Sequence, residues 1–229
     1  AFYLRTRKAL LHPFLGELEE YNFPEDKLER PYSDFPSSKI DSAVDLCSVH
    51  AGRICEPPAA VENGVVCARS DPPNWVRLPD AQPDKILVYL SFPSCNWIVK
   101  KAAGIKHMEI NGSLSLQRRA AVLKEFRLSQ DTFVLLLSNV GTVGLNIAFA
   151  NIVIVVDNLW SAQENEQLIG RVWRHPQKKR VIVYYLIAEN TSDVFLNTIS
   201  RDKGMMQNAF MNIPTELSKY CDDRDVTPG

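Results

Sequence analysis

Short apolar runs alternate with amphipathic stretches along the chain after residue 84. The apolar runs are rich in β-branched residues, which is typical of strands buried on both faces. These predicted strands are residues 86–90, 107–110, 133–137, 152–156 and 181–187, and the predicted helices are residues 96–103, 116–127, 163–172 and a stretch from about residue 192. This alternation predicts an α/β fold with an open, mostly parallel sheet and helices on both faces.

Proline dominates the first part of the chain. Of the 14 prolines, 11 come before residue 94, and each removes a backbone donor and fixes φ. Residues 22–84 are therefore predicted to be a loop-rich segment that precedes the sheet. Ligands of open α/β sheets bind at the carboxyl ends of the strands, so the loops that follow the predicted strands are where chemistry is expected.

Charge and composition narrow the class of protein. The chain has 229 residues with 26 basic and 27 acidic side chains, so nucleic acid could be bound only by a local basic face. No apolar run approaches the roughly 20 residues of a membrane-spanning helix, and we expect no membrane partner. Five cysteines without a C-x-x-C pair favour a reducing compartment over a secreted disulfide framework. A start at Ala1 without a signal pattern suggests a fragment.

The loop after residue 137 is the first candidate for binding. Gly141 and Gly144 follow Ser138 and Asn139, and glycines in a strand-to-helix turn let the backbone approach a phosphate or another chain. A tight turn with a capping asparagine explains the same residues, so the loop alone does not decide between the two interpretations.

The predicted helix near residues 163–172 carries the second candidate. Arg171 and Arg174 are three residues apart and project from one helical face, with Gln167 one turn earlier. Two planar, permanently charged guanidiniums on one face suit a polyphosphate. A basic face that only meets solvent is the alternative.

Both candidates match motifs of the Swi/Snf-type DNA translocases, which are helicase-type ATPases. The sixth motif of that family, Q-x-x-G-R-x-x-R-x-G-Q, is matched by Gln167, Gly170, Arg171, Arg174 and Gln177. The fifth, T-K-A-G-G-L-G-L-N-L, is matched by Gly141 and residues 144–147. Asp157 and Trp160 remain from the element D-P-W-W-N-P between them.

Three upstream stretches extend the resemblance. Residues 85–92 are similar to the strand of the fourth motif, and residues 7–15 (RKALLHPFL) are similar to the R-K-x-x-x-H-P-x-L segment that joins the two lobes of the family. The D-G-x-x-x-x-x-x-R element is matched by Asn111, Gly112, Arg118, Arg119 and Phe126. Residues 85–208 thus resemble the second RecA-like lobe of this family.

The resemblance implies a domain organisation and a set of site residues. The segments would be an inter-lobe connection (1–21), a Pro-rich insertion or linker (22–84), a RecA-like helicase C-terminal lobe (85–208) and a tail (209–229). Arg171 and Arg174 would be catalytic arginine fingers, and ATP would also contact Gln167, Gly144 and Gly170. The implied nucleic-acid contacts are Ser138, Asn139, Trp160, Asn111 and Arg118.

The implied function is that of the second motor lobe of an ATP-dependent DNA translocase or chromatin-remodelling-type ATPase. ATP and Mg²⁺ would be bound mainly by the N-terminal RecA-like lobe of the same protein, and no metal ligand is expected in this lobe. The other implied partner is double-stranded DNA, with nucleosomes as a further substrate and the nucleus as the location.

Two absences and several departures limit the expected activity. A phosphate-binding P-loop needs Gly-Lys followed by Ser or Thr, and the sequence contains neither a Gly-Lys nor an Asp-Glu dipeptide. The chain is therefore expected not to hydrolyse ATP by itself. Asn139 and Thr142 replace family residues in the fifth motif. These departures motivate the rival hypothesis of a non-catalytic interaction module on a degenerate helicase-like fold.

The Pro-rich segment contains four soft ligands, Cys47, His50, Cys55 and Cys67. Their spacing would permit tetrahedral zinc but matches no common zinc pattern, so isolated thiols are the favoured interpretation.

Overall fold

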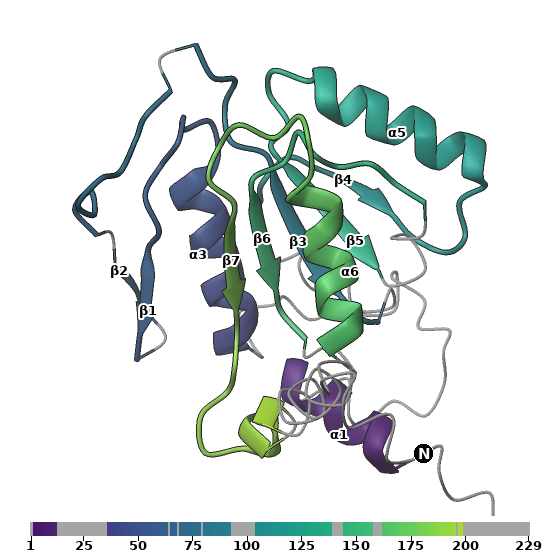
Figure 1. Cartoon of the computed structure of the whole chain (residues 1–229). Coiled ribbons are helices and arrows are strands. Elements are labelled where there is room, and N and C mark those ends of the chain that lie inside the picture. The colour runs from purple at the N-terminus through teal and green to yellow at the C-terminus, as the bar shows by residue number, and fades with distance from the viewer. Residues whose placement is uncertain are drawn as a thin grey trace, which may run out of the picture.

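The computed structural model of the chain describes residues 2–12, 36–63, 65–67, 69–78, 80–92, 104–138, 144–157, 162–195 and 197–198. Its central sheet contains β3 (Ile86–Leu90), β4 (His107–Ile110), β5 (Val134–Ser138), β6 (Ile152–Val155) and β7 (Ile182–Tyr185). The strand order is β4-β5-β3-β6-β7, and all neighbours run parallel (Figure 1). The predicted RecA-like open parallel sheet is confirmed.

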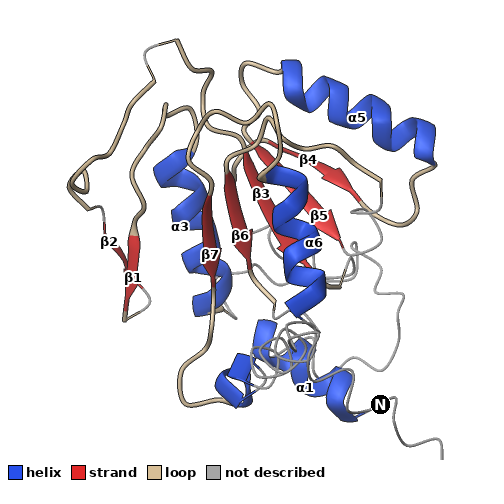
Figure 2. Cartoon of the chain, in the orientation of Figure 1, coloured by secondary structure: helices blue, strands red, loops and turns tan. Residues whose placement is uncertain are grey.

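Helices cover both faces of the sheet, also as predicted (Figure 2). Successive strand residues point to opposite faces, so Val88 and Tyr89 of β3 enter two separate core clusters. One cluster is completed by α3 (Ser38–His50), and the other by α5 (Leu116–Leu128) and α6 (Ala162–Val172). Every residue of β3, β5 and β6 is buried, which explains why these strands are continuous apolar runs in the sequence.

The expectation of a loop-rich segment over residues 22–84 needs one correction. Residues 38–50 form the 13-residue helix α3, which lies in the proline-free window between Pro36 and Pro57. Ile40, Ala43 and Cys47 are buried on one face of this helix, at the spacing of three and four residues that an amphipathic helix requires. Counting prolines does not reveal this periodicity. The apolar face of the helix packs against the sheet and forms part of its core.

Smaller elements complete the comparison with the sequence. The Pro-rich segment also contains an antiparallel pair of short strands, β1 (Ala60–Glu62) and β2 (Val65–Cys67). Residues 192–195 are helical as expected, whereas the helix predicted at 96–103 lies outside the described residues. Within the described ranges, no helix combines the length and apolar character needed to cross a membrane.

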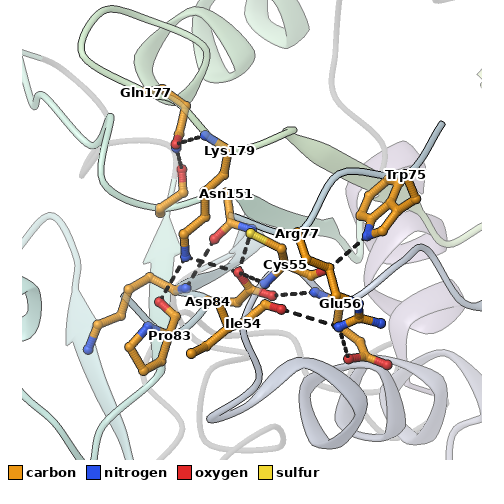
Figure 3. A network of polar contacts seen from close by, with 12 residues as sticks. Ile54, Cys55, Glu56, Trp75, Arg77, Pro83, Asp84, Asn151, Gln177 and Lys179 are labelled. Carbon is orange, nitrogen blue, oxygen red and sulfur yellow. Dashed lines mark hydrogen bonds and ion pairs between the residues drawn. The ribbon is translucent and has the colours of Figure 1, made fainter. Parts of the chain in front are cut away.

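A buried carboxylate ties the amino ends of three strands together (Figure 3). Asp84, which precedes β3, is 0% exposed and accepts hydrogen bonds from Lys179 Nζ at 3.0 Å and Asn151 Nδ2 at 2.8 Å. These partners precede β7 and β6. The same carboxylate accepts from the backbone N–H groups of Cys55 and Glu56 at 3.2 and 3.1 Å. Asp84 thereby also anchors the chain that follows α3.

The opposite edge of the sheet is covered by α1 (Phe2–Leu11), which lies beyond the carboxyl ends of the strands (Figure 1). Arg7 Nη2 forms an ion pair with Asp157 Oδ2 at 3.0 Å, just after β6. Lys39 of α3 forms a second buried pair with Asp193 at 2.5 Å. Two buried ion pairs therefore dock the N-terminal helices at the edge where open α/β sheets bind ligands.

The end of α3 is fixed by a buried histidine. His50 is 0% exposed, and its Nε2 lies 2.8 Å from the hydroxyl of Tyr184 in β7. That hydroxyl also accepts the Ala59 N–H at 2.8 Å. Burial lowers the pKa of His50 from its usual value of 6.5, and the carboxylates of Asp84 and Glu56 only partly oppose this effect. The folded protein therefore favours the neutral imidazole.

This burial predicts a pH-dependent stability. His50 binds a proton more readily in the unfolded chain than in the folded one, so the free energy of unfolding should fall as the pH drops below about 6.5. Chemical denaturation between pH 8 and 5 measures the effect. His50→Phe should flatten this dependence, whereas His175→Gln, at an exposed site, should not. Equal pH profiles for wild type and His50→Phe would contradict the assignment.

Candidate functional site

The end of α6 meets the loop that follows β5. Arg171, in the last turn of α6, donates from Nη1 to the carbonyl of Leu145 at 3.3 Å, and its own carbonyl accepts the Ile147 N–H at 3.2 Å. Gly144 precedes this contact with a φ of +77°, a left-handed conformation that glycine adopts without strain. The structure thus brings together predicted nucleotide-contacting residues from two motifs.

The two predicted arginine fingers differ in their surroundings. Arg171 is partly buried, and its Nε is buried without a hydrogen-bond partner among the described residues. Arg174 follows the helix and is exposed. Gln167 and Gly170 are also exposed, and a Cβ on Gly170 would meet no atom within 4 Å other than those of its chain neighbours and its own helix backbone. One guanidinium is therefore anchored by the fold and the other is open to solvent.

A cleft of about 830 Å³ opens beside this loop, near the amino edge of the sheet. Gly144 lines it, its apolar wall includes Leu123, Leu145 and Phe149, and its exposed cations are Lys124, Arg127 and Lys178. Asp80 is the single carboxylate among the described residues that line the cleft. The excess of positive charge favours an anionic ligand or partner beside Gly144.

The predicted nucleic-acid contacts fall at the opposite edge. Ser138 ends β5, pairs with Leu90 of β3 in the sheet register, and is 0% exposed. Its Oγ has no hydrogen-bond partner in the part of the chain that the structure describes. Asn139 and Trp160 lie outside the described residues. Of these three predicted contacts, only Ser138 lies among the described residues, and its hydroxyl is buried.

Asn111 and Arg118 lie at the turn between β4 and α5. The Asn111 side chain accepts from the Ser113 N–H at 3.0 Å and donates to Glu109 at 2.8 Å, which stabilises the turn. The Arg118 N–H donates to the Oγ of the N-cap residue Ser115 at 3.2 Å, while the Arg118 side chain is exposed. Arg118 is therefore available to a ligand, whereas Asn111 already has a structural role.

Sequence reasoning missed the ion pair between Arg7 and Asp157. Both residues belong to matched motifs, but nothing in the sequence links positions 150 residues apart. Asp157 did carry a signal, because it is a charged residue that directly follows a buried strand. Such a residue normally requires a partner when it stays buried.

The four soft ligands of the Pro-rich segment do not gather. No group of three or more His, Cys, Asp or Glu side chains that could hold a metal ion occurs among the described residues. Cys47, Cys55 and Cys67 are free thiols, and burial raises the pKa of Cys47 to about 12. The Nε2 atom of His50 is hydrogen-bonded to the hydroxyl of Tyr184. Among the described residues, the structure thus offers no arrangement of these side chains around a common point.

The different surroundings of the two arginines predict different effects on stability. Arg171→Ala should lower the free energy of unfolding by about 1 to 3 kcal/mol, because it removes a charged donor to a loop carbonyl. Arg174→Ala should leave the melting temperature unchanged, since this side chain is exposed. Thermal denaturation of both variants tests this, and equal losses of stability would contradict it.

Comparison with known proteins shows which family the chain resembles. The pattern of the helicase conserved C-terminal domain matches residues 76–176. The chain is 27% identical over 225 residues to a Caenorhabditis elegans protein named as a homologue of a SWI/SNF-related regulator of chromatin containing a DEAD/H box. This match covers 87% of the chain and 22% of that relative.

Two further relatives are named as DNA repair proteins. The chain is 32% identical over 133 residues to DNA repair protein RAD5 of Cryptococcus neoformans, covering 56% of the chain and 11% of the relative. It is 34% identical over 87 residues to the human DNA repair and recombination protein RAD54-like, covering 37% and 12%. The chain thus spans about a fifth or less of the length of these relatives.

Among solved structures, the C-terminal part of the Fun30 ATPase domain is similar with a TM-score of 0.49 and 23% identity, covering 51% of this chain and 39% of that one. The family pattern and the relatives agree with the matched motifs and the parallel sheet. The chain is thus similar to the C-terminal lobe of Swi/Snf-type helicases.

Proposed function

We propose that this chain is the second motor lobe of an ATP-dependent DNA translocase or chromatin-remodelling-type ATPase. In this proposal Arg171 and Arg174 complete an ATP site on a first lobe of the same protein. The observation that carries it is the meeting of the α6 end with the loop at Gly144, where the Arg171 guanidinium donates to the carbonyl of Leu145, the residue after a glycine with left-handed backbone. The exposed Arg174 follows three residues later.

The anchored arginine suits the electrostatics of phosphoryl transfer to water. A guanidinium that is held before the reaction stabilises the charge of the transferring phosphoryl group without reorganising at that moment. Arg171 is held by the Leu145 carbonyl, and its Nε keeps an unused donor. The exposed Arg174 would meet the phosphates when the two lobes close, and Gln167 and Gly170 lie on the same stretch.

The surroundings fit an anion better than a metal ion. The exposed cations of the cleft, Lys124, Arg127 and Lys178, add positive charge beside Gly144. Because the described residues form no metal-binding group, the ligands of Mg²⁺ would come mainly from the first lobe. Mg²⁺ would neutralise phosphate charge there. The part of this chain would be to supply cationic donors.

Double-stranded DNA is the proposed second substrate, at the carboxyl edge of the sheet. The names of the relatives refer to DNA repair and chromatin, which supports DNA as the partner, nucleosomes as a further substrate and the nucleus as the location. Ser138 and Arg118 would contribute contacts, with Asn139 and Trp160 from the adjoining loops and Asn111 at the β4 end. Burial of Ser138 means that this contact requires a local rearrangement.

The alternative is a non-catalytic interaction module on the same fold. Its motivation is the departure of Asn139 and Thr142 from the fifth motif. The two functions differ in whether the full protein hydrolyses ATP through Arg171 and Arg174.

In the full protein, Arg174→Lys should reduce DNA-stimulated ATP hydrolysis severely although it keeps the positive charge. A compact ammonium cannot reproduce the planar fork of donors, and loss of an arginine finger costs factors of about 10³ to 10⁵ in rate. Phosphate release at saturating ATP measures the effect. Lys178→Arg is a matched control at the cleft and should retain the rate. Full activity of Arg174→Lys would favour the non-catalytic module.

The chain by itself should release no phosphate from ATP. It contains no Gly-Lys dipeptide with which a P-loop could hold the β- and γ-phosphates. The measurement is phosphate release by the purified 229-residue chain, with Arg171→Ala as the control for contaminating ATPases. Turnover that Arg171→Ala abolishes would show that the chain holds a complete site and would refute this division between lobes.

A further inference from the structure

The cleft beside Gly144 is built from separate parts of the chain. One wall is a single face of α5, whose lining residues are spaced by three or four positions, as a helical face requires: Ala120, Leu123, Lys124 and Arg127. A second wall is formed by residues 144–146, 148–149 and 176–179, and a third by residues 80–83 of the Pro-rich segment. Neither Arg171 nor Arg174 lines the cleft, so it is distinct from the proposed arginine-finger site.

The ammonium groups inside this cleft already have partners. Lys85 Nζ donates to the carbonyls of Ser129 and Thr132, both at 2.7 Å. Lys179 Nζ donates to the buried carboxylate of Asp84 at 3.0 Å (Figure 3). A site for a small polar ligand needs a few convergent polar groups that are free to bind it. These two lysines are instead used by the fold.

What the cleft offers a ligand is an apolar wall beside exposed cations. Leu123, Leu145 and Phe149 form the half-buried apolar wall. The exposed cations, Lys124, Arg127 and Lys178, take part in none of the ion pairs among the described residues. An apolar centre bordered by exposed polar groups is the usual anatomy of a protein interface, in which surface charge selects a partner of opposite sign.

Nucleic acid fits this surface less well than an acidic protein segment. Phe149 is the one aromatic side chain among the described residues of the cleft, and the Arg127 guanidinium carbon already lies 5.9 Å from the centre of its ring. The Phe126 ring packs against it as well, with its centre 5.9 Å away. A nucleic acid needs open ring faces for its bases, and its hydrated phosphates gain nothing from an apolar wall.

We propose that the cleft beside Gly144 is a docking site for an acidic segment of a partner protein. Bulky apolar side chains of that segment would enter between α5 and residues 144–149, and its Asp and Glu side chains would meet Lys124, Arg127 and Lys178. This inference goes beyond the proposed function, because it involves neither arginine finger and requires no ATP hydrolysis.

Selection from a library of random short peptides by the 229-residue chain is the first test. The selected peptides should be enriched both in Asp and Glu and in Leu, Ile, Phe or Trp, relative to the starting library. The affinity of a selected peptide should fall between about 0.01 M and about 0.1 M salt, because the Debye length shortens from about 30 Å to about 10 Å. No enrichment, or enrichment in Lys and Arg, would overturn the proposal.

Two neighbouring alanines of α5 provide a matched pair of variants. Ala120 and Ala121 are both exposed, but only Ala120 is among the described residues that line the cleft. Ala120→Glu should weaken binding of a selected peptide at least about tenfold, because it places a negative charge against an acidic segment. Ala121→Glu adds the same side chain outside the cleft and should retain the affinity. Equal affinities of the two variants would refute the site.

A charge reversal on the opposite wall tests whether the peptide lies within the cleft. Lys178→Glu should also weaken binding at least about tenfold. Its exposed position predicts an unchanged melting temperature, so loss of binding would not reflect unfolding. Retained affinity would show that the peptide binds α5 alone and would refute a site formed by both walls.

Competition and the full protein exclude the other occupants. Neither double-stranded DNA nor ATP should displace a selected peptide from the 229-residue chain, and displacement by either would assign the cleft to that ligand and overturn the proposal. The full protein should bind the same peptide. Loss of binding there would show that another part of the protein covers the cleft, which refutes a separate partner. A full protein that binds the peptide but hydrolyses no ATP would refute the proposed function alone.

Discussion

The buried carboxylate of Asp84 is the contact on which the arrangement of the chain depends most. A sheet covered on both faces leaves its polar groups at the strand ends, where they must find partners or lose their hydration without compensation. Asp84 resolves this at the amino edge, since it joins the starts of β3, β6 and β7 and receives the backbone after α3 (Figure 3). Removing its charge would leave Lys179, which is 9% exposed, buried without its carboxylate.

The two edges of the sheet carry different chemistry. The amino edge presents the cationic cleft and the arginine end of α6, whereas the carboxyl edge carries α1 and the proposed DNA contacts. Helix α6 begins near one edge and ends near the other (Figure 1). The 11-residue helix α6 therefore connects the proposed nucleotide and DNA sites. Leu168 and Val172 pack into the core and fix the position of the helix on the sheet.

Some residues that match the family motifs serve the fold directly. Gln177 ends the sixth motif, yet its side chain donates to the Ala150 carbonyl at 2.6 Å and accepts the Lys179 N–H at 2.9 Å. Asn111 stabilises its own turn in the same manner. A motif match therefore does not by itself separate a ligand contact from a structural one. The partners of each side chain make that distinction, and by this criterion the exposed Arg174 and Arg118 are freer to meet a ligand than Gln177 or Asn111.

The sequence by itself determined the parallel sheet, the order of its strands and helices along the chain, and the motifs that identify the lobe. These features are local, because β-branched runs and motif spacings are written in neighbouring residues. It did not predict α3 as part of the core. Prolines flank this helix on both sides, and the spacing of its apolar residues stabilises it only where they pack against the sheet. Nor could it pair Arg7 with Asp157 or Asp84 with Lys179, residues that are 150 and 95 positions apart. Only the tertiary structure decides such pairs, because a charge can remain buried only where folding brings its partner within reach.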